Sequence, residues 1–341
     1  QRRGRLGLSP IKSWLDAIAK LKSPSEMLTL LARMERVGLG GLWGIMLDQD
    51  MRSSEQWRMY ICQSGLGMPD REYYLKDDAE SKRVRAAYER HLEALARLAG
   101  YGASEAASRR ATIMRIETEL ARASMRKEDT RDVDKIYNRM SLAQLAKLTP
   151  RIDWAEYFRI LGAKAHEVIA MQPEFLKAAE RMLYTHPIEE WRVYLELQLI
   201  SDMSGYLTPA LAREAFRFYG RALMGTKHMR PLWRRVLGAV SGSLGEPLGR
   251  IYIKEHFPPE AKRRMLQMLD DLFEAYEARI KKLDWMSPAT KKKALTKLSM
   301  VARKIGYPDK WKSYTGLLIK PDDYAGNALR AAAYEHKRAM R

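Results

Sequence analysis

The histidines are the residues of this 341-residue chain that are best suited to catalysis or metal binding, and there are six of them. Two histidines four residues apart on a helix, with a glutamate directly after the first, would hold zinc and supply a general base for hydrolysis. Only His166-Glu167 begins this pattern, but its fifth position is Ala170 and the stretch reads as a strand. We therefore expect no metal site in this chain, whose histidines are His91, His166, His186, His228, His256 and His336.

Patterns for other kinds of catalysis are incomplete. Ser64 is followed by Gly65-Leu66-Gly67 but lacks the glycine that a nucleophile elbow needs two residues before its serine. The glycines between Gly238 and Gly249 match neither phosphate-binding pattern. The adjacent acids Asp270 and Asp271 would point about 100° apart on a helix, so they do not form an acid–base pair. We therefore assign no catalytic residue and leave the substrate-binding residues unassigned.

The clearest secondary structure lies between Gly245 and Trp311. Pro258-Pro259-Glu260 marks the start of a helix, and apolar residues then recur at steps of three and four. Ser287 followed by proline marks a second helix, which we expect to end at Gly306. The short connection between the two predicts an antiparallel helical hairpin within residues 245–311.

Strand signals are few. The segments Leu42–Leu47 and Gln56–Cys62 are rich in aromatic and branched residues, and the polar stretch between them predicts a β-hairpin. His166–Met171 is a short apolar piece before a proline, which indicates an edge strand. Cys62, the only cysteine, follows two apolar residues and is expected to be a small buried side chain rather than a reactive thiol.

A loop from Gln63 to Leu75 follows the hairpin, so that residues 38–75 form a hairpin with its loop. Asp70, Arg71 and Tyr73 of this loop have two interpretations. They are either contacts at a domain junction or a local set of hydrogen bonds and packing contacts that fixes the loop, and we favour the second.

The remaining sequence predicts helices. The content of 46% hydrophobic and 30% charged residues is typical of a folded protein, and no apolar run approaches the length of a membrane span. No internal repeat is visible. We predict a mainly α fold, one multi-helix lobe over residues 1–341 with a small β-hairpin appendage. The other expected helices are two within 10–37, then 77–98, 104–124, 141–147, 154–161, 173–184, 188–204, 209–223, and one from 321 to the end.

The net charge of +19 raises the possibility of a nucleic-acid partner. The 61 basic residues are, however, interspersed with 42 acidic ones, as where Glu260 precedes Arg263 and Glu277 precedes Lys281. Such spacing is typical of solvated helix faces. We expect a basic face that meets an acidic partner domain or acidic peptides, with a basic helical adaptor for nucleic acid or another anionic partner as the alternative.

Six runs of sequence between Gln63 and Trp311 carry a family resemblance: QSGLGMPDREYYL, ETELARAS, YNRMSLAQLAKLTPRIDWAEYF, LGEPLGRIYIKEHFPPEAKRRM, RIKKLDWMSPATKKKALTKL and KIGYPDKW. In this order they resemble the non-catalytic half of neprilysin-like zinc metallopeptidases, which include the endothelin-converting enzymes and bacterial oligopeptidases. Vertebrate members are rich in disulfides, so the single cysteine indicates a bacterial-type member.

The resemblance implies a helical lobe that closes over a separate thermolysin-like lobe, with a chamber for peptides between them. Zinc and its ligands would belong to that second lobe, expected after Arg341, and this sequence has no thermolysin-like catalytic subdomain. The chain would be a fragment of the enzyme, a subunit of a split enzyme, or a binding or regulatory protein without catalysis. Alone it is expected to be inactive. The chain starts at Gln without a secretion signal, which leaves the compartment open, and the family favours a periplasmic or secreted location.

Overall fold

The computed structural model describes residues 2–340, whose backbone contacts form two compact units. The first unit comprises Gln1–Arg230 and Leu317–Arg341, and the second comprises Pro231–Gly316. The second unit is therefore inserted into the first along the chain. The prediction that residues 1–341 act as one lobe stays a prediction.

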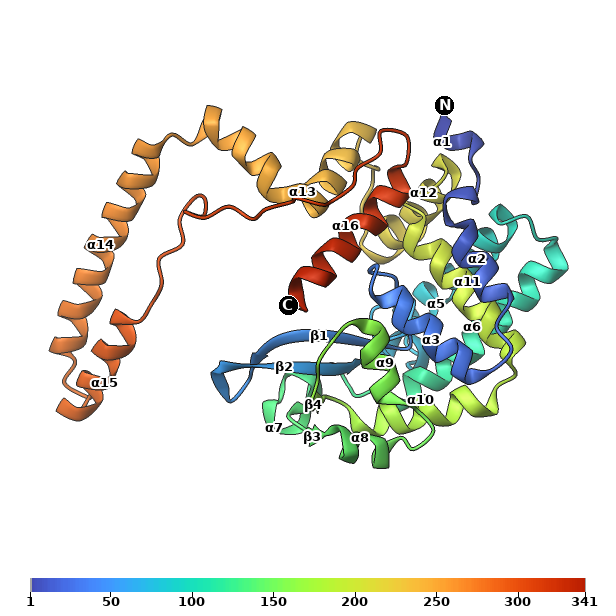
Figure 1. Cartoon of the computed structure of the whole chain (residues 1–341), viewed down its shortest axis with the longest axis horizontal. Helices are drawn as coiled ribbons and strands as arrows, with labels where there is room; N and C mark the ends of the chain where they lie inside the picture. Colours follow the sequence, from blue (N-terminus) through green and yellow to red (C-terminus); the bar gives the residue numbers. More distant parts are fainter. Residues whose placement is uncertain (1, 341) are drawn as a thin grey trace. The chain divides into compact units, whose positions relative to one another are not determined.

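Helices make up most of the first unit, which confirms the mainly α prediction (Figure 1). In residues 2–340, no helix has the length and apolar character needed to cross a bilayer. The α-helices of this unit are α1 Arg2–Arg5, α2 Lys12–Ala19, α3 Pro24–Glu35, α4 Glu72–Leu75, α5 Ala79–Leu98, α6 Ala103–Ala123, α7 Val133–Ile136, α8 Leu142–Leu148, α9 Trp154–Leu161, α10 Pro173–Thr185, α11 Ile188–Met203, α12 Pro209–Ala215 and α16 Tyr324–Ala339. Short 3₁₀ turns lie at Ser9–Ile11 and Asp129–Arg131, and a π-helix at Phe216–Leu223 continues α12.

Helix α6 is central to the first unit because it packs against α4, α5, α10 and α11. Its buried face includes Ile113, Ile116, Leu120 and Ala121, together with the carboxyl group of Glu117. The last helix, α16, belongs to the same unit although the whole insertion precedes it. Its His336 Nε2 lies 2.7 Å from the Leu161 carbonyl oxygen, which ties α16 to α9.

The predicted hairpin is present and is part of a larger sheet. Strands β1 (Trp43–Asp50) and β2 (Ser53–Gln63) pair antiparallel, and β4 (Glu167–Ala170) and β3 (Arg139–Ser141) extend the sheet in the order β1-β2-β4-β3. The strand predicted at His166–Met171 is confirmed as β4, but its edge position was wrong. β4 lies between β2, to which it is parallel, and β3, because its apolar residues are buried on both faces.

The second unit contains α13 (Leu232–His256), α14 (Pro259–Lys282) and α15 (Pro288–Ser299). α13 is interrupted at Leu244, whose backbone is not helical. The predicted start signals are confirmed: a proline opens α14, and the Ser287 side chain accepts a hydrogen bond from the Thr290 N–H at the start of α15. α14 and α15 pack against each other as expected of a hairpin (Figure 1).

The predicted end of the second helix of this hairpin was wrong. α15 ends at Ser299, seven residues before Gly306. The segment after it returns along α14 because polar contacts hold it there: Arg303 pairs with Asp270 at 2.8 Å, and Lys262 donates to the Tyr307 carbonyl at 2.9 Å. A continued helix would lose both contacts.

Candidate functional site

Among residues 2–340, no three His, Cys, Asp or Glu side chains group closely enough to hold a metal ion. The incomplete motif at His166-Glu167 lies at the start of β4 rather than on a helix. Glu167 is engaged by Arg139, whose Nη2 lies 2.6 Å from its Oε2. This pair holds β3 against β4, so the motif is part of the sheet.

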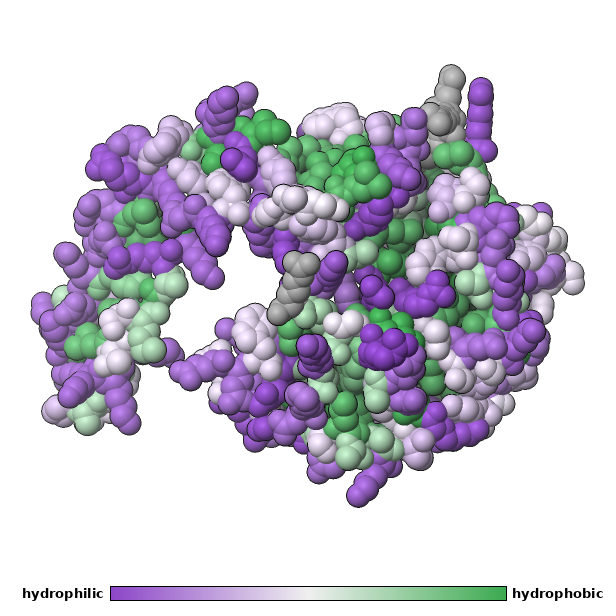
Figure 2. Space-filling view, viewed as in Figure 1, coloured by the Kyte–Doolittle hydropathy of each residue, from purple (hydrophilic) through white to green (hydrophobic). Residues whose placement is uncertain are grey.

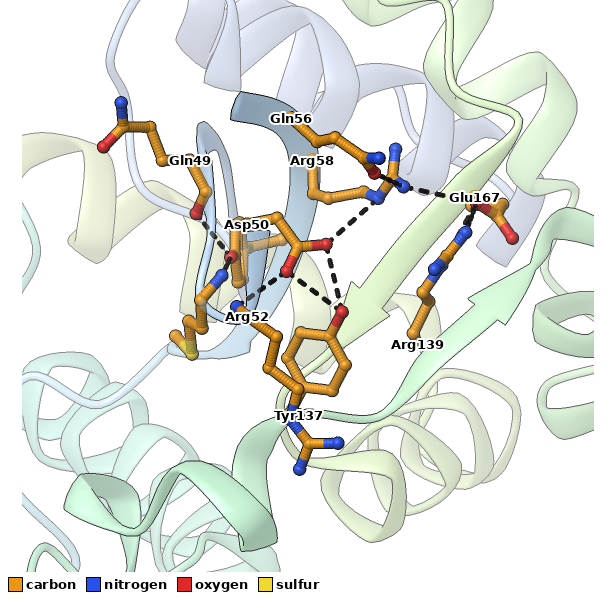
Figure 3. A network of polar contacts seen from close by, with 10 residues as sticks. Gln49, Asp50, Arg52, Gln56, Arg58, Tyr137, Arg139 and Glu167 are labelled. Atoms are coloured by element: carbon orange, nitrogen blue, oxygen red, sulfur yellow. Dashed lines mark hydrogen bonds and ion pairs between the residues drawn. The ribbon is translucent and has the colours of Figure 1, made fainter. Parts of the chain in front are cut away.

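A polar network around Asp50 closes the far end of the β1–β2 hairpin (Figure 3). The side chain of Asp50 is only 2% exposed. Both of its carboxylate oxygens lie 3.0 Å from the Tyr137 hydroxyl, which follows α7. The carboxylate also accepts a hydrogen bond from the Arg52 backbone N–H at 2.8 Å and pairs with Arg58 Nε at 3.3 Å. Asp50 thereby joins the hairpin turn to a segment far away in the sequence.

Arg58 links this network to a second carboxylate, because its Nη2 lies 3.8 Å from Glu167 (Figure 3). Hydrogen bonding to the Arg52 backbone N–H is the largest influence on Asp50 and lowers the pKa of its carboxyl, with Tyr137 and Arg58 acting in the same direction. Hydrogen bonding from Arg139 likewise lowers the pKa of Glu167. Both acids are therefore ionised at neutral pH and hold the end of the sheet in one arrangement.

A cavity of about 300 Å³ adjoins this network. It opens beside the exposed end of β1, where Met46 and Met51 are each 41% exposed. Its lining combines apolar side chains with acidic ones: Met46, Asp48, Gln49, Asp50, Met51, Ser54 and Tyr60. Because Asp50 is already engaged, Asp48 is the acid that remains exposed at the cavity.

The loop predicted to carry domain-junction contacts is fixed from within the first unit. Asp70 Oδ1 accepts a hydrogen bond from the Glu72 N–H at 2.9 Å, and Arg71 Nη1 donates to the Ser124 carbonyl at 2.5 Å. The Tyr73 carbonyl accepts from Arg85 Nε at 3.0 Å. Only the Asp70 contact lies within the loop, whereas Arg71 and Tyr73 are bound to residues outside it. A role of these residues at a domain junction stays a prediction.

A buried glutamate, missed in the sequence, anchors the same loop. Glu117 on α6 accepts hydrogen bonds from the Tyr74 hydroxyl at 2.6 Å and the Tyr88 hydroxyl at 3.0 Å. The Gly67 N–H is a further partner, and desolvation by burial raises the pKa of Glu117 to about 7. A signal existed in the sequence, because Glu117 falls on the apolar face formed by Ile113, Ile116 and Leu120.

The second unit exposes apolar side chains in rows. None of the described residues of α13, α14 or α15 is buried. On α14, Met265, Met268, Leu272 and Tyr276 follow one another at three- and four-residue steps and are 37–58% exposed. We call these four residues the α14 stripe. Figure 2 shows the apolar groups of this unit as green patches among hydrophilic side chains. A row of this kind is typical of a face that a partner covers.

The charge of the second unit is also uneven, since Pro231–Gly316 contains 18 Lys and Arg against 9 Asp and Glu. Several of these charges form the exposed pairs expected from the sequence. Glu260 lies 2.6 Å from Arg263, and Glu277 lies 2.6 Å from Lys281. The excess that remains makes this unit basic, which suits an anionic partner surface.

Comparisons with known proteins identify relatives over nearly the whole chain. Residues 1–308 match the profile of peptidase family M13. Endothelin-converting enzyme-like 1 of Rattus norvegicus is 30% identical over 287 residues, which is 82% of this chain and 36% of that protein. The neutral endopeptidase of Lactobacillus helveticus is 28% identical over 278 residues, 81% of this chain and 42% of that protein. The chain thus spans well under half of these curated relatives.

Solved structures agree with the sequence comparison. The zinc metalloprotease Zmp1 of Mycobacterium tuberculosis, in complex with an inhibitor, superposes with a TM-score of 0.90 at 34% identity. The match covers 99% of this chain and 51% of that chain. A second structure of the same enzyme, in an open state, gives the same TM-score and identity, with 53% of its chain covered. About half of that enzyme therefore has no counterpart in these 341 residues.

Proposed function

Because this chain belongs to peptidase family M13 and corresponds to its N-terminal region, we propose that it is the non-catalytic, substrate-enclosing lobe of a zinc metalloendopeptidase that acts on peptides. In this proposal zinc and the groups that cleave the peptide bond belong to a complementary half. The chain alone does not hydrolyse peptides.

The observation that carries this proposal is the exposed apolar surface of the second unit. Helices of 25 and 24 residues without one buried side chain would leave much apolar area in water. The α14 stripe is about 16 Å long at 1.5 Å per residue, enough to receive one helix of a partner. The relatives supply the kind of partner, because their chains extend well beyond the matched part.

The physical role of such a lobe is to enclose. A lobe that closes over a metal site excludes water and holds an extended peptide in place, and it admits only chains thin enough to enter. The first unit, with its large buried core, its buried Glu117 and its network around Asp50, suits a wall of this kind.

The test is reconstitution from two chains. The purified chain would be measured for zinc and for hydrolysis of a quenched fluorescent peptide, alone and after co-expression with the zinc-binding half of a related M13 peptidase. We expect the chain alone to contain no zinc and to hydrolyse no peptide. We expect the co-expressed chains to form a complex that contains zinc and hydrolyses the peptide. Stoichiometric zinc with hydrolysis by the chain alone would refute the proposal, as would the absence of any complex.

Two alternatives have different outcomes in the same experiment. A binding or regulatory subunit would form the complex or bind peptides without ever supporting hydrolysis. A basic adaptor, which the 18 basic residues of the second unit favour, would bind DNA with an affinity that falls steeply as salt is raised. Retention on DNA at physiological salt together with no complex would favour the adaptor.

A further inference from the structure

Strand β1 has an open edge. It lies at one end of the sheet order and pairs with β2 alone among the described strands. Alternate residues of an antiparallel strand direct their backbone groups to opposite sides. The Ile45 N–H is bound by a side chain of α3 instead of by β2, so Ile45, Leu47 and Gln49 direct their backbone groups away from the hairpin.

Side chains form hydrogen bonds with the outward backbone groups at both ends of this edge but not in its middle. The Ile45 N–H donates to Glu35 Oε1 at 2.5 Å, and the Gln49 N–H donates to Asp48 Oδ1 at 2.7 Å. The Gln49 carbonyl accepts from the Tyr60 hydroxyl at 2.7 Å. In the described part of the chain, no group forms a hydrogen bond with the N–H and C=O of Leu47 or with the C=O of Ile45.

These three open groups match the backbone of one extended partner. A peptide residue opposite Leu47 donates to its carbonyl and accepts from its N–H, as in a hydrogen-bonded antiparallel pair. A residue two positions along donates to the Ile45 carbonyl. The backbone groups on either side already have side-chain partners, so a partner strand can pair only with this short stretch. A long edge without such partners would instead be prone to aggregation.

The cavity beside β1 gives this partner a preferred side chain. Residues of the peptide next to the one opposite Leu47 project on the face of Met46 and Asp48, where the cavity of about 300 Å³ lies. Met46, Met51 and Tyr60 provide apolar contact for a long aliphatic stem, and the exposed carboxylate of Asp48 provides a partner for a cation at its end.

We propose that the open edge of β1 binds an extended peptide by strand addition, with an Arg or Lys side chain of that peptide in the cavity beside Asp48. The proposal rests on the proposed function, since the peptide is the substrate that the lobe encloses. This preference for a basic peptide is opposite to the preference for acidic peptides that the net charge of the chain predicts, so a measurement with both kinds of peptide distinguishes them.

Binding of labelled peptides to the whole 341-residue chain tests this proposal. The probe is an unstructured, proline-free heptapeptide with blocked ends and a central Arg, followed by fluorescence anisotropy and by hydrogen exchange of the Leu47 amide. We expect saturable binding, slower exchange at Leu47, and weaker binding of the same peptide with a central Glu. Two N-methylated versions of the peptide test the pairing of the backbones. Methylation of the nitrogens that face β1 is expected to prevent binding, whereas methylation of the alternate nitrogens, which face away, is expected to leave binding intact.

Two variants locate the site. Leu47→Pro removes the outward N–H without touching the β1–β2 ladder and is expected to weaken binding about fivefold to tenfold, whereas Leu47→Val retains it. Asp48→Asn leaves the backbone of β1 free to pair and is expected to abolish the preference for Arg over Glu. This variant keeps the test valid if Leu47→Pro fails to fold.

Unchanged binding in Leu47→Pro and with both N-methylated peptides would overturn the proposal, as would an Arg preference that survives in Asp48→Asn. These outcomes differ from failure of the proposed function. If peptides bind at β1 but the chain never supports hydrolysis, only the proposed role in an enzyme is contradicted. If the reconstituted enzyme hydrolyses peptides but Leu47→Pro has no effect on peptide binding, only the proposed binding at the open edge of β1 is contradicted.

Discussion

The hydroxyl of Tyr74 lies 2.6 Å from Oε2 of Glu117, and both residues are buried. Tyr74 also accepts a hydrogen bond from the Met68 N–H at 2.9 Å. The loop that follows β2 is thereby tied to the middle of α6, the central helix of the first unit. A carboxyl at this position makes the fold sensitive to pH and to small changes in the loop.

The pH dependence follows from the pKa of Glu117, which burial raises from 4.5 to about 7. Between these values the unfolded chain has lost the proton that the folded chain keeps, so stability falls as pH rises from about 4.5 to 7 and is level above. The change is about 3 kcal/mol for this group. Glu117→Gln is expected to remove this part of the slope in urea unfolding measured at several pH values.

Two comparisons check that assignment. Burial also raises the pKa of Glu35 to about 7, so Glu35→Gln is expected to remove a second, separate part of the slope. Glu105 is an exposed acid at the start of α6, and Glu105→Gln is expected to leave the slope unchanged. A profile identical in Glu117→Gln and the parent chain would contradict the assignment.

Gly67 is expected to tolerate no side chain. A Cβ at this position would overlap the hydroxyl and ring of Tyr88, which is buried and bound to Glu117. Gly67→Ala is therefore expected to reduce the free energy of unfolding by about 1–3 kcal/mol. Gly205→Ala is a matched control, because nothing lies within 4 Å of its added Cβ. Equal midpoints in thermal or urea unfolding of the two variants would count against the close packing of Gly67 and Tyr88.

The network around Asp50 is expected to control local opening of the hairpin. Asp50→Asn weakens the pairing with Arg58 and changes one acceptor of the Tyr137 hydroxyl into a donor. Amide exchange in residues 48–57 is then expected to be roughly tenfold faster, the effect of losing one or two hydrogen bonds. Asp48→Asn, at an exposed site on the same strand, serves as the control. Identical exchange rates in the two variants would show that the network does not hold the turn.

The α14 stripe is expected to be an interface rather than a structural element. Leu272 is 46% exposed, so Leu272→Lys changes the stability of the chain by about 0.5 kcal/mol or less. It is expected to weaken the complex with a zinc-binding half at least tenfold, because a charge replaces apolar contact. Gln267→Lys introduces the same charge at an exposed polar position of α14. Equal loss of the complex in both variants would show that charge alone, and not the stripe, is responsible.

Local signals predicted much of the helical structure. Caps such as Ser287, and the hairpin over Leu42–Leu47 and Gln56–Cys62, depend on neighbouring residues and were correct. The end of α15 and the inner position of β4 were wrong because each is decided by contacts with residues distant in the sequence. β3, with three residues, is too short to give a periodic signal.

The candidate surfaces were harder to predict than the elements. Asp50 looks like any acid in a turn, and only the packing of Tyr137 and Arg58 against it shows its role. Glu117 interrupts an apolar face and was the one residue with a visible signal. The open groups of Leu47 are backbone groups, so no side-chain pattern indicates them.

The discontinuity of the first unit bears on how the chain is made. On the ribosome, residues up to Arg230 emerge before the inserted unit, and α16 is synthesised after it. His336, which binds the Leu161 carbonyl in the folded protein, is therefore synthesised only after 174 intervening residues. Until then the surface that α16 covers is exposed in the nascent polypeptide, and that interval is when a chaperone would be needed most.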